Sequence, residues 1–176
     1  QRMPLAVRNH IIKHCAERTG CAHFGLLIGE RAGLHTFGLL GLLMKHAPDV
    51  KSALQIMIRH LRVHILGASV TLQQEGDHAM LVWRLHEPGV EAVDHVGDGT
   101  VAALHVAMRE LCGPDWRPTE ARFAHRMPAD VGPYRQFFRI ALRLPHLGDF
   151  EQGRAETLVF CAARKAPADV RLGLEN

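Results

Sequence analysis

The 176-residue sequence has little of what common catalytic and membrane motifs require. It contains only two serines, Ser52 and Ser69, and no G-x-S-x-G segment, and neither serine is expected on a strand-to-helix turn with a base behind it. No apolar run approaches the roughly 18 residues of a membrane-spanning helix. No segment has the pattern of a signal peptide either. We therefore expect a cytoplasmic protein that is not an enzyme and has no membrane contact, although a cysteine and a histidine that meet only in space would still allow a small enzyme.

Metal motifs are also sparse. The four cysteines are widely scattered and include no C-x-x-C pair: Cys15, Cys21, Cys112 and Cys161. We expect reduced thiols and no cofactor. A zinc or haem site stays open as an alternative. His10 and His14 are spaced to share a helix face, Cys21 is nearby in the sequence, and histidine and cysteine are common ligands of such sites.

Two patterns could hold a phosphate. The segment VGDGT, Val96 to Thr100, would place backbone N–H groups at a helix start, but no P-loop Lys-Ser/Thr follows, so we expect Asp98 or Thr100 to be an ordinary N-cap. Arg135, Arg139 and Arg143 form two overlapping R-x-x-x-R spacings of the kind that some cyclic-dinucleotide receptors use. The alternative is that these arginines lie on the surface at the end of an amphipathic helix.

The composition is that of an ordinary globular domain. The chain is 47% hydrophobic and 22% charged, with a formal net charge of +3. A chain of this length buries a sizeable core without disulfides. The basic residues are dispersed apart from a loose group between Arg117 and Arg143, and this group is weak evidence for a nucleic-acid surface. We expect one domain over residues 1–176.

Helical spacing dominates the first third of the chain. It predicts a helix over Leu5 to Arg18, ended by Thr19-Gly20, and a buried helix over the segment TFGLLGLLMKHAP, ended by Pro48. A third helix is expected after a cap at Asp49 or Ser52, with Leu54, Ile58, Leu61 and Ile65 on one face. No element is predicted for the glycine-punctuated segment HFGLLIGERAGLHTFG, which follows the first helix.

Farther along the chain, apolar and polar residues alternate, which is typical of β-strands. Val70 and Leu72, and then Leu81, Trp83 and Leu85, alternate with polar residues around a turn, which predicts a β-hairpin. A central helix is expected from Gly99 to Cys112, and further elements follow: a strand EARFAH, a short helix from Pro133 to Phe138, and strands RIALRL and ETLVFCAA. The order predicts an α+β fold, with N-terminal helices on one face of a largely antiparallel sheet.

Several motifs carry a family resemblance: Thr19-Gly20 with His23-Phe24-Gly25-Leu26 and Gly29, Phe37-Gly38-Leu39-Leu40-Gly41, Leu54 to Arg62, Glu75-Gly76-Asp77, Gly113-Pro114-Asp115-Trp116-Arg117-Pro118, Phe123-Ala124-His125, Pro128-Ala129-Asp130, Tyr134, Phe137-Phe138 and Thr157-Leu158-Val159-Phe160. In combination they resemble the N-terminal effector-binding domain of AraC-type transcription regulators, in the arabinose-binding-like subgroup. The sequence departs from that family after Phe138, where RIALRLPHLGDFEQGRAE replaces a shorter strand.

The resemblance implies a sensor. Such a domain binds a small-molecule effector, forms a homodimer and alters how attached DNA-binding units are presented. Those units, two helix-turn-helix motifs, are expected to lie outside this chain, so DNA would be contacted only through that part. Arabinose itself is not carried over as the ligand.

An effector pocket is expected between the helices and the sheet, mostly apolar with a few polar groups. The candidate ligand-binding residues are Phe24, Phe37, Arg62, His64, Trp83, His125, Tyr134 and Phe138. For each of them, packing in or beside the core is the alternative. The helix from Gly99 to Cys112 is a candidate dimer surface if one of its apolar faces does not pack on the sheet.

Overall fold

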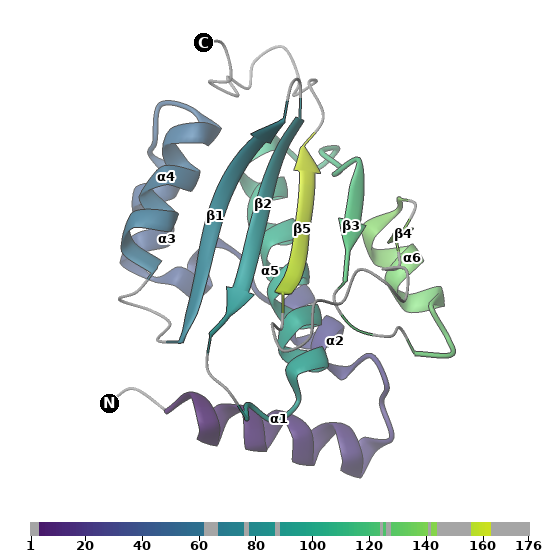
Figure 1. Cartoon of the computed structure of the whole chain (residues 1–176). Coiled ribbons are helices and arrows are strands. Elements are labelled where there is room, and N and C mark those ends of the chain that lie inside the picture. Colours follow the sequence, from purple (N-terminus) through teal and green to yellow (C-terminus); the bar gives the residue numbers. More distant parts are fainter. Residues whose placement is uncertain are drawn as a thin grey trace.

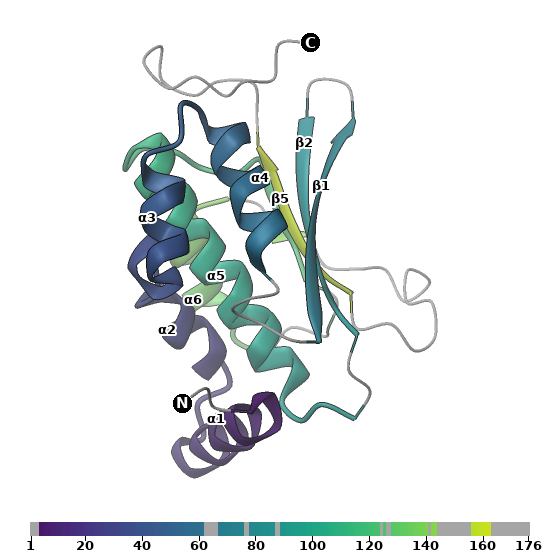
Figure 2. The ribbon, with the colours of Figure 1, turned by 90° about the vertical axis from the view of Figure 1, so that its left-hand side faces the viewer.

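The computed structural model describes residues 4–61, 67–75, 78–86, 89–123, 125, 128–140, 142–143 and 156–162. In chain order the elements are α1 (Leu5–Thr19), α2 (Phe24–Glu30), the 3-10 helix η1 (Leu34–Phe37), α3 (Leu39–Lys45), α4 (Val50–His60), β1 (Ala68–Glu75), β2 (His78–Leu85), α5 (Val93–Cys112), β3 (Glu120–Arg122), α6 (Gly132–Phe138), β4 (Leu142–Arg143) and β5 (Glu156–Ala162) (Figure 1). The described helices lie on one side of the sheet (Figure 2), which confirms the predicted α+β class.

The sheet has five strands in the order β1-β2-β5-β3-β4. The pairs β1/β2, β2/β5 and β5/β3 are antiparallel, and only the short β3/β4 pair is parallel. The predicted largely antiparallel sheet is therefore confirmed. Its third position is filled by β5, which comes last in the chain and lies between two strands that precede it (Figure 1).

The hairpin follows the predicted alternation. Val70 pairs with Trp83 and Leu72 with Leu81, so apolar residues of both strands share one face. Val70, Leu81 and Trp83 are buried in the core. The helices lie against this face of β1 and β2.

Two of the opening helices begin or end as expected. The first ends at Gly20, whose φ of 62° is left-handed backbone that glycine adopts without strain. The helix α4 begins at Asp49, whose carboxylate accepts a 2.7 Å hydrogen bond from the Ser52 N–H. Val50, Leu54 and Met57 then face the core.

The glycine-punctuated segment, for which the sequence predicted no element, contains the helix α2 over Phe24–Glu30. The glycines of α2 lie where this helix contacts α5. A Cβ on Gly25 would overlap the backbone of His95, and one on Gly29 would overlap the carbonyl of Gly99 and the side chain of Ala102. Glycines that resembled turn residues in the sequence allow two helix backbones to approach closely.

The structure also differs from the single buried helix predicted over TFGLLGLLMKHAP. The 3-10 helix η1 and the helix α3 are separated at Gly38, where φ is 56°. Leu40 and Met44 are buried, but Leu39, Leu42 and Leu43 are 72%, 53% and 49% exposed. Only one side of α3 therefore contributes to the core.

The central helix begins six residues earlier than predicted, at Val93 instead of Gly99. Asp98 and Thr100 are therefore inside α5, and the predictions of an N-cap or a phosphate loop at VGDGT are wrong. Glycine and aspartate are weak helix formers, so this helical turn depends on tertiary contacts. The helix packs against both α2 and β5, so its apolar residues are used within the chain.

The Cys112 to Phe138 region completes the core. Trp116, Phe123 and Phe138 are buried, and His105 of α5 lies among aromatic rings, 5.1 to 5.9 Å from the ring centres of Phe137, Phe138 and Trp116. Burial, with the nearby Arg109 charge, lowers the pKa of His105 to about 4. A neutral imidazole is therefore part of the packing at neutral pH.

We expect Gly29→Ala to lower the free energy of unfolding by about 1 to 3 kcal/mol, because the added methyl group must push α2 away from α5. The direction of this change tests the helix contact, because alanine is intrinsically the better helix former by roughly 1 kcal/mol and would otherwise stabilise the protein. Urea unfolding followed by circular dichroism measures the change. Glu30→Ala, at the exposed neighbouring position, should stay within about 0.5 kcal/mol of the parent. A Gly29→Ala protein at least as stable as the parent would show that the helices do not touch here.

We expect acid to destabilise the fold through His105. Its folded pKa of about 4 lies below the ordinary value of 6.5, so the unfolded chain binds more protons between these values. The contribution of His105 is therefore complete above pH 6.5 and is lost as the pH falls, by about 2 kcal/mol at pH 5. His105→Phe should flatten this part of the stability curve, whereas His14→Phe at an exposed position should not. Equal pH dependence in the two variants would contradict the assignment.

Candidate functional site

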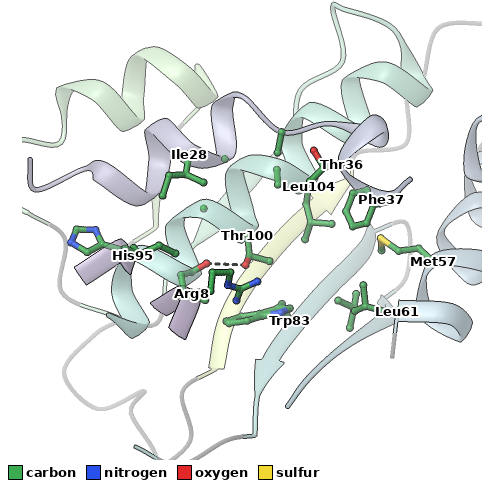
Figure 3. Close-up of a pocket in the computed structure, with 17 residues that line it drawn as sticks. Arg8, Ile28, Thr36, Phe37, Met57, Leu61, Trp83, His95, Thr100 and Leu104 are labelled. Carbon is green, nitrogen blue, oxygen red and sulfur yellow. Dashed lines mark hydrogen bonds between the residues drawn. The ribbon is translucent and has the colours of Figure 1, made fainter. Parts of the chain in front are cut away.

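A cavity of about 210 Å³ lies between the helices and the hairpin face of the sheet (Figure 3). The elements α1, α2, η1, α4, β1, β2 and α5 all contribute to its wall. The lining residues are Arg8, Ile12, Ile28, Gly29, Ala32, Thr36, Phe37, Met57, Leu61, Val70, Trp83, His95, Val96, Gly99, Thr100, Ala103 and Leu104. Most of this wall is apolar, as in small-molecule sites generally.

Among the described residues that line the cavity, Arg8 is the only Asp, Glu, Lys or Arg. It comes from α1 and is half-buried, and in Figure 3 its side chain reaches toward Thr100 and Trp83. Its Nε donates a long 3.4 Å hydrogen bond to the Asn9 side chain. No carboxylate lies within ion-pair distance of it in the described part of the chain. Burial lowers the pKa of the guanidinium below its usual value, although the group stays charged.

Other polar groups in the wall are few. The Thr100 hydroxyl donates to the carbonyl of Val96 at 2.8 Å, within α5, and the Thr36 hydroxyl accepts from the Gly33 N–H at 3.2 Å. The Trp83 indole N–H is buried and has no acceptor among the described residues. Buried indole N–H groups usually have a partner, so this donor is unusual. The buried Nδ1 of His95, also in the wall, has no partner among the described residues either. The cavity therefore combines an apolar wall with unused polar groups of Arg8, Trp83 and His95.

A second, more open depression of about 540 Å³ lies next to α1 and the first turns of α5. Asp98, 1% exposed, lies at its base. The Asp98 carboxylate accepts hydrogen bonds from the Tyr134 hydroxyl at 2.5 Å and lies 2.7 Å from His125 Nε2. Burial and then the Asp98 charge raise the pKa of Tyr134. These groups satisfy one another, so we consider the smaller apolar cavity the better ligand site.

The predicted site residues are divided between these places. Phe37 and Trp83 line the apolar cavity, and His125 lines the polar depression. Tyr134 and Phe138 are 0% exposed and belong to the core. The remaining residue of known position, Phe24, is half-buried at the start of α2 and is in neither lining. Arg62 and His64 lie outside the described residues.

Sequence reasoning missed Arg8, the most distinctive group of the cavity. A signal was present: Arg8 is three residues after Leu5 and four before Ile12, so it stands within the apolar stripe of its helix. A charged residue in such a stripe must have a compensating partner or lie next to a polar space. Met57 and Thr100 were missed because nothing in a local pattern distinguishes a cavity wall from a filled core.

The alternative chemistries find little support in the geometry. Among the described residues, no three His, Cys, Asp or Glu side chains gather closely enough to hold a metal ion, and His10 lies 3.1 Å from Glu91 instead. The helix α6 ends at Phe138, so Arg143 in β4 is not on the same helix as Arg135. The Ser69 hydroxyl lies 2.7 Å from His86 Nε2 in an exposed pair, but Ser69 is in strand β1 and not on a strand-to-helix turn.

Three of the four cysteines lie in the described part of the chain. Cys15, Cys21 and Cys112 are free thiols, as predicted. Burial raises the pKa of Cys112 to about 12, so this thiol is not a nucleophile at neutral pH.

Comparison with protein families matches residues 1–145 to the arabinose-binding domain of AraC transcription regulators, N-terminal. The chain belongs to this family. Comparison with curated proteins found no similar sequence. The family is one of regulatory ligand-binding domains and is not an enzyme family, which agrees with the resemblance seen in the motifs. The described helices include none that is long and apolar enough to cross a membrane.

We expect the Asp98 cluster to hold α5 against α6. Tyr134→Phe removes one hydrogen bond from a buried carboxylate, which should lower the free energy of unfolding by about 1 to 3 kcal/mol. The same substitution in an Asp98→Leu background should cost clearly less, because the acceptor is already gone. Urea unfolding of the four proteins of this cycle measures the coupling. Equal costs in the two backgrounds would mean that Tyr134 acts by packing alone.

Proposed function

We propose that this chain is the effector-sensing domain of a transcription regulator and that its effector binds in the apolar cavity. The observation that carries this proposal is the cavity itself, which is bordered by seven elements and contains an arginine with no carboxylate partner among the described residues. The membership of the family supports a regulatory ligand-binding role. The proposed effector contacts are Phe37 and Trp83, which the sequence already suggested, together with Arg8, Met57 and Thr100, which line the same cavity.

The arrangement of the cavity suits a sensor. Its wall joins α1, which contacts the rest of the domain sparsely, to the well-packed α5 and the sheet. A ligand that touches all three favours the arrangement in which they are together. Such differential affinity for two arrangements is all that a sensing domain needs.

The rest of the function is part of the same proposal. The parent regulator works in the cytoplasm as a homodimer, and DNA is bound by a separate helix-turn-helix part whose presentation depends on the sensor. The family description supports the link to transcription. The domain breaks no bond in this scheme.

We expect an effector at 100 times its dissociation constant to stabilise the domain by about 2.7 kcal/mol, which raises the melting temperature by roughly 5 to 10 °C. A thermal-shift screen of carboxylic acids, amino acids, sugars and nucleotides would find it. Ala103→Leu, which fills part of the cavity, should weaken binding at least tenfold while the protein stays folded. Ala6→Leu makes the same change at an exposed position of α1 and should leave binding unchanged. A hit that binds the Ala103→Leu protein equally well would place the effector elsewhere.

A further inference from the structure

The position of Arg8 restricts what the cavity can bind. Burying a guanidinium among apolar side chains is costly unless an anion or several acceptors compensate it. In the described residues the only recorded acceptor of Arg8 is the Asn9 side chain, at 3.4 Å, and that bond uses Nε. The two terminal nitrogens of the guanidinium can form a forked pair with a carboxylate. The unused donors thus match a carboxylate group in both charge and shape.

The remaining wall indicates what is attached to that carboxylate. In Figure 3, Arg8 lies with Thr100 and Trp83, whereas Phe37, Met57, Leu61 and Leu104 lie toward the other end of the cavity. The second group has only apolar side-chain atoms apart from the weakly polar sulfur of Met57. A ligand with an apolar body and one polar end would place each part against a matching surface.

Other ligand classes fit less well. A sugar has several hydroxyl groups that need partners, and each one left unpaired in an apolar space costs free energy. A phosphate ester carries up to two charges and three acceptor oxygens, whereas the described part of the wall offers one Arg or Lys side chain. An amine would meet the guanidinium with a like charge.

The volume limits the size of the ligand. An engineered apolar cavity of ~150 Å³ binds benzene, so a cavity of about 210 Å³ takes a somewhat larger molecule. Scaling by volume gives roughly eight to ten non-hydrogen atoms. Octanoate is within this range, and a long-chain lipid is not.

From these observations we propose that the effector is a small amphipathic carboxylate, whose carboxylate pairs with Arg8 and accepts from the Trp83 indole N–H, and whose apolar body lies against Phe37, Met57 and Leu104. This inference rests on the proposed function and makes it more specific. It assigns Arg8 as the residue that selects anionic ligands.

The test compares three probes of nearly equal size: octanoate, octanamide and octylamine. Isothermal titration of the whole chain should show octanoate binding about ten- to a hundredfold more tightly than octanamide, with octylamine weakest, since a charge-assisted pair is lost in both. Arg8→Met keeps the length of the side chain and removes the charge. It should weaken octanoate by a similar factor and leave octanamide within about threefold.

Two control variants make the outcomes distinct. Arg31→Met, at an exposed arginine after α2, should leave octanoate binding unchanged, and Ala103→Leu should weaken octanoate and octanamide alike. Equal affinities of octanoate and octanamide, both weakened by Ala103→Leu, would overturn the carboxylate proposal and keep the cavity as the site. Octanoate binding that is insensitive to Arg8→Met would also overturn it. If none of the three probes binds, this inference fails, and the proposed function is then decided by the wider screen with Ala103→Leu.

Discussion

The close contact between α2 and α5 is the constraint on which the rest of this structure depends. Gly25 and Gly29 bring the backbone of α2 against α5, and Gly99 lies opposite, where an added Cβ would be 3.1 Å from the Gly25 carbonyl oxygen. On its other side, α5 packs against β5 of the sheet. Gly29 and Gly99 also line the apolar cavity, so the residues that bring the helices together also leave the space beside them.

Two charged side chains of the described residues are withdrawn from solvent to different degrees, Asp98 almost completely and Arg8 by about half. Asp98 is at the centre of a closed set, with Tyr134 and His125 occupying its two oxygens. Arg8 is beside an open space, with one long hydrogen bond. A buried charge whose hydrogen bonds are all formed within the protein stabilises one arrangement of that protein. A charge with unused hydrogen-bonding groups can instead stabilise a bound ligand. The helix that carries Arg8 is joined to the body partly through His10, Lys13 and Glu91, which are surface contacts of small energetic weight.

Much of the fold could be predicted from the sequence, because its signals are local. The Asp49 cap, the alternation of Val70 and Trp83, and the stop at Gly20 each act within a few residues of themselves. The helix α2 and the first turns of α5 could not be predicted in this way. Their glycines and Asp98 are poor helix formers, and they become helical only because each supplies the other with a surface that fits.

The site was predictable only in outline for the same reason. An apolar pocket between helices and sheet follows from the architecture, and Phe37 and Trp83 were expected there. Which side chains leave a space unfilled is decided by contacts between distant segments: Arg8, Met57 and Thr100 are far apart in the chain and meet only in the folded domain. Arg8 alone left a local trace, as a charge in an apolar stripe.

The place of β5 in the sheet affects how this domain should be delimited. The family match ends at residue 145, yet residues 156–162 form the strand between β2 and β3. A protein cut at the end of the match would lose the middle of its sheet, and the facing edges of β2 and β3 would both present unpaired amide and carbonyl groups to water and to other chains. Such a fragment is the kind that aggregates on expression, so the shortest useful version of this domain extends past Ala162.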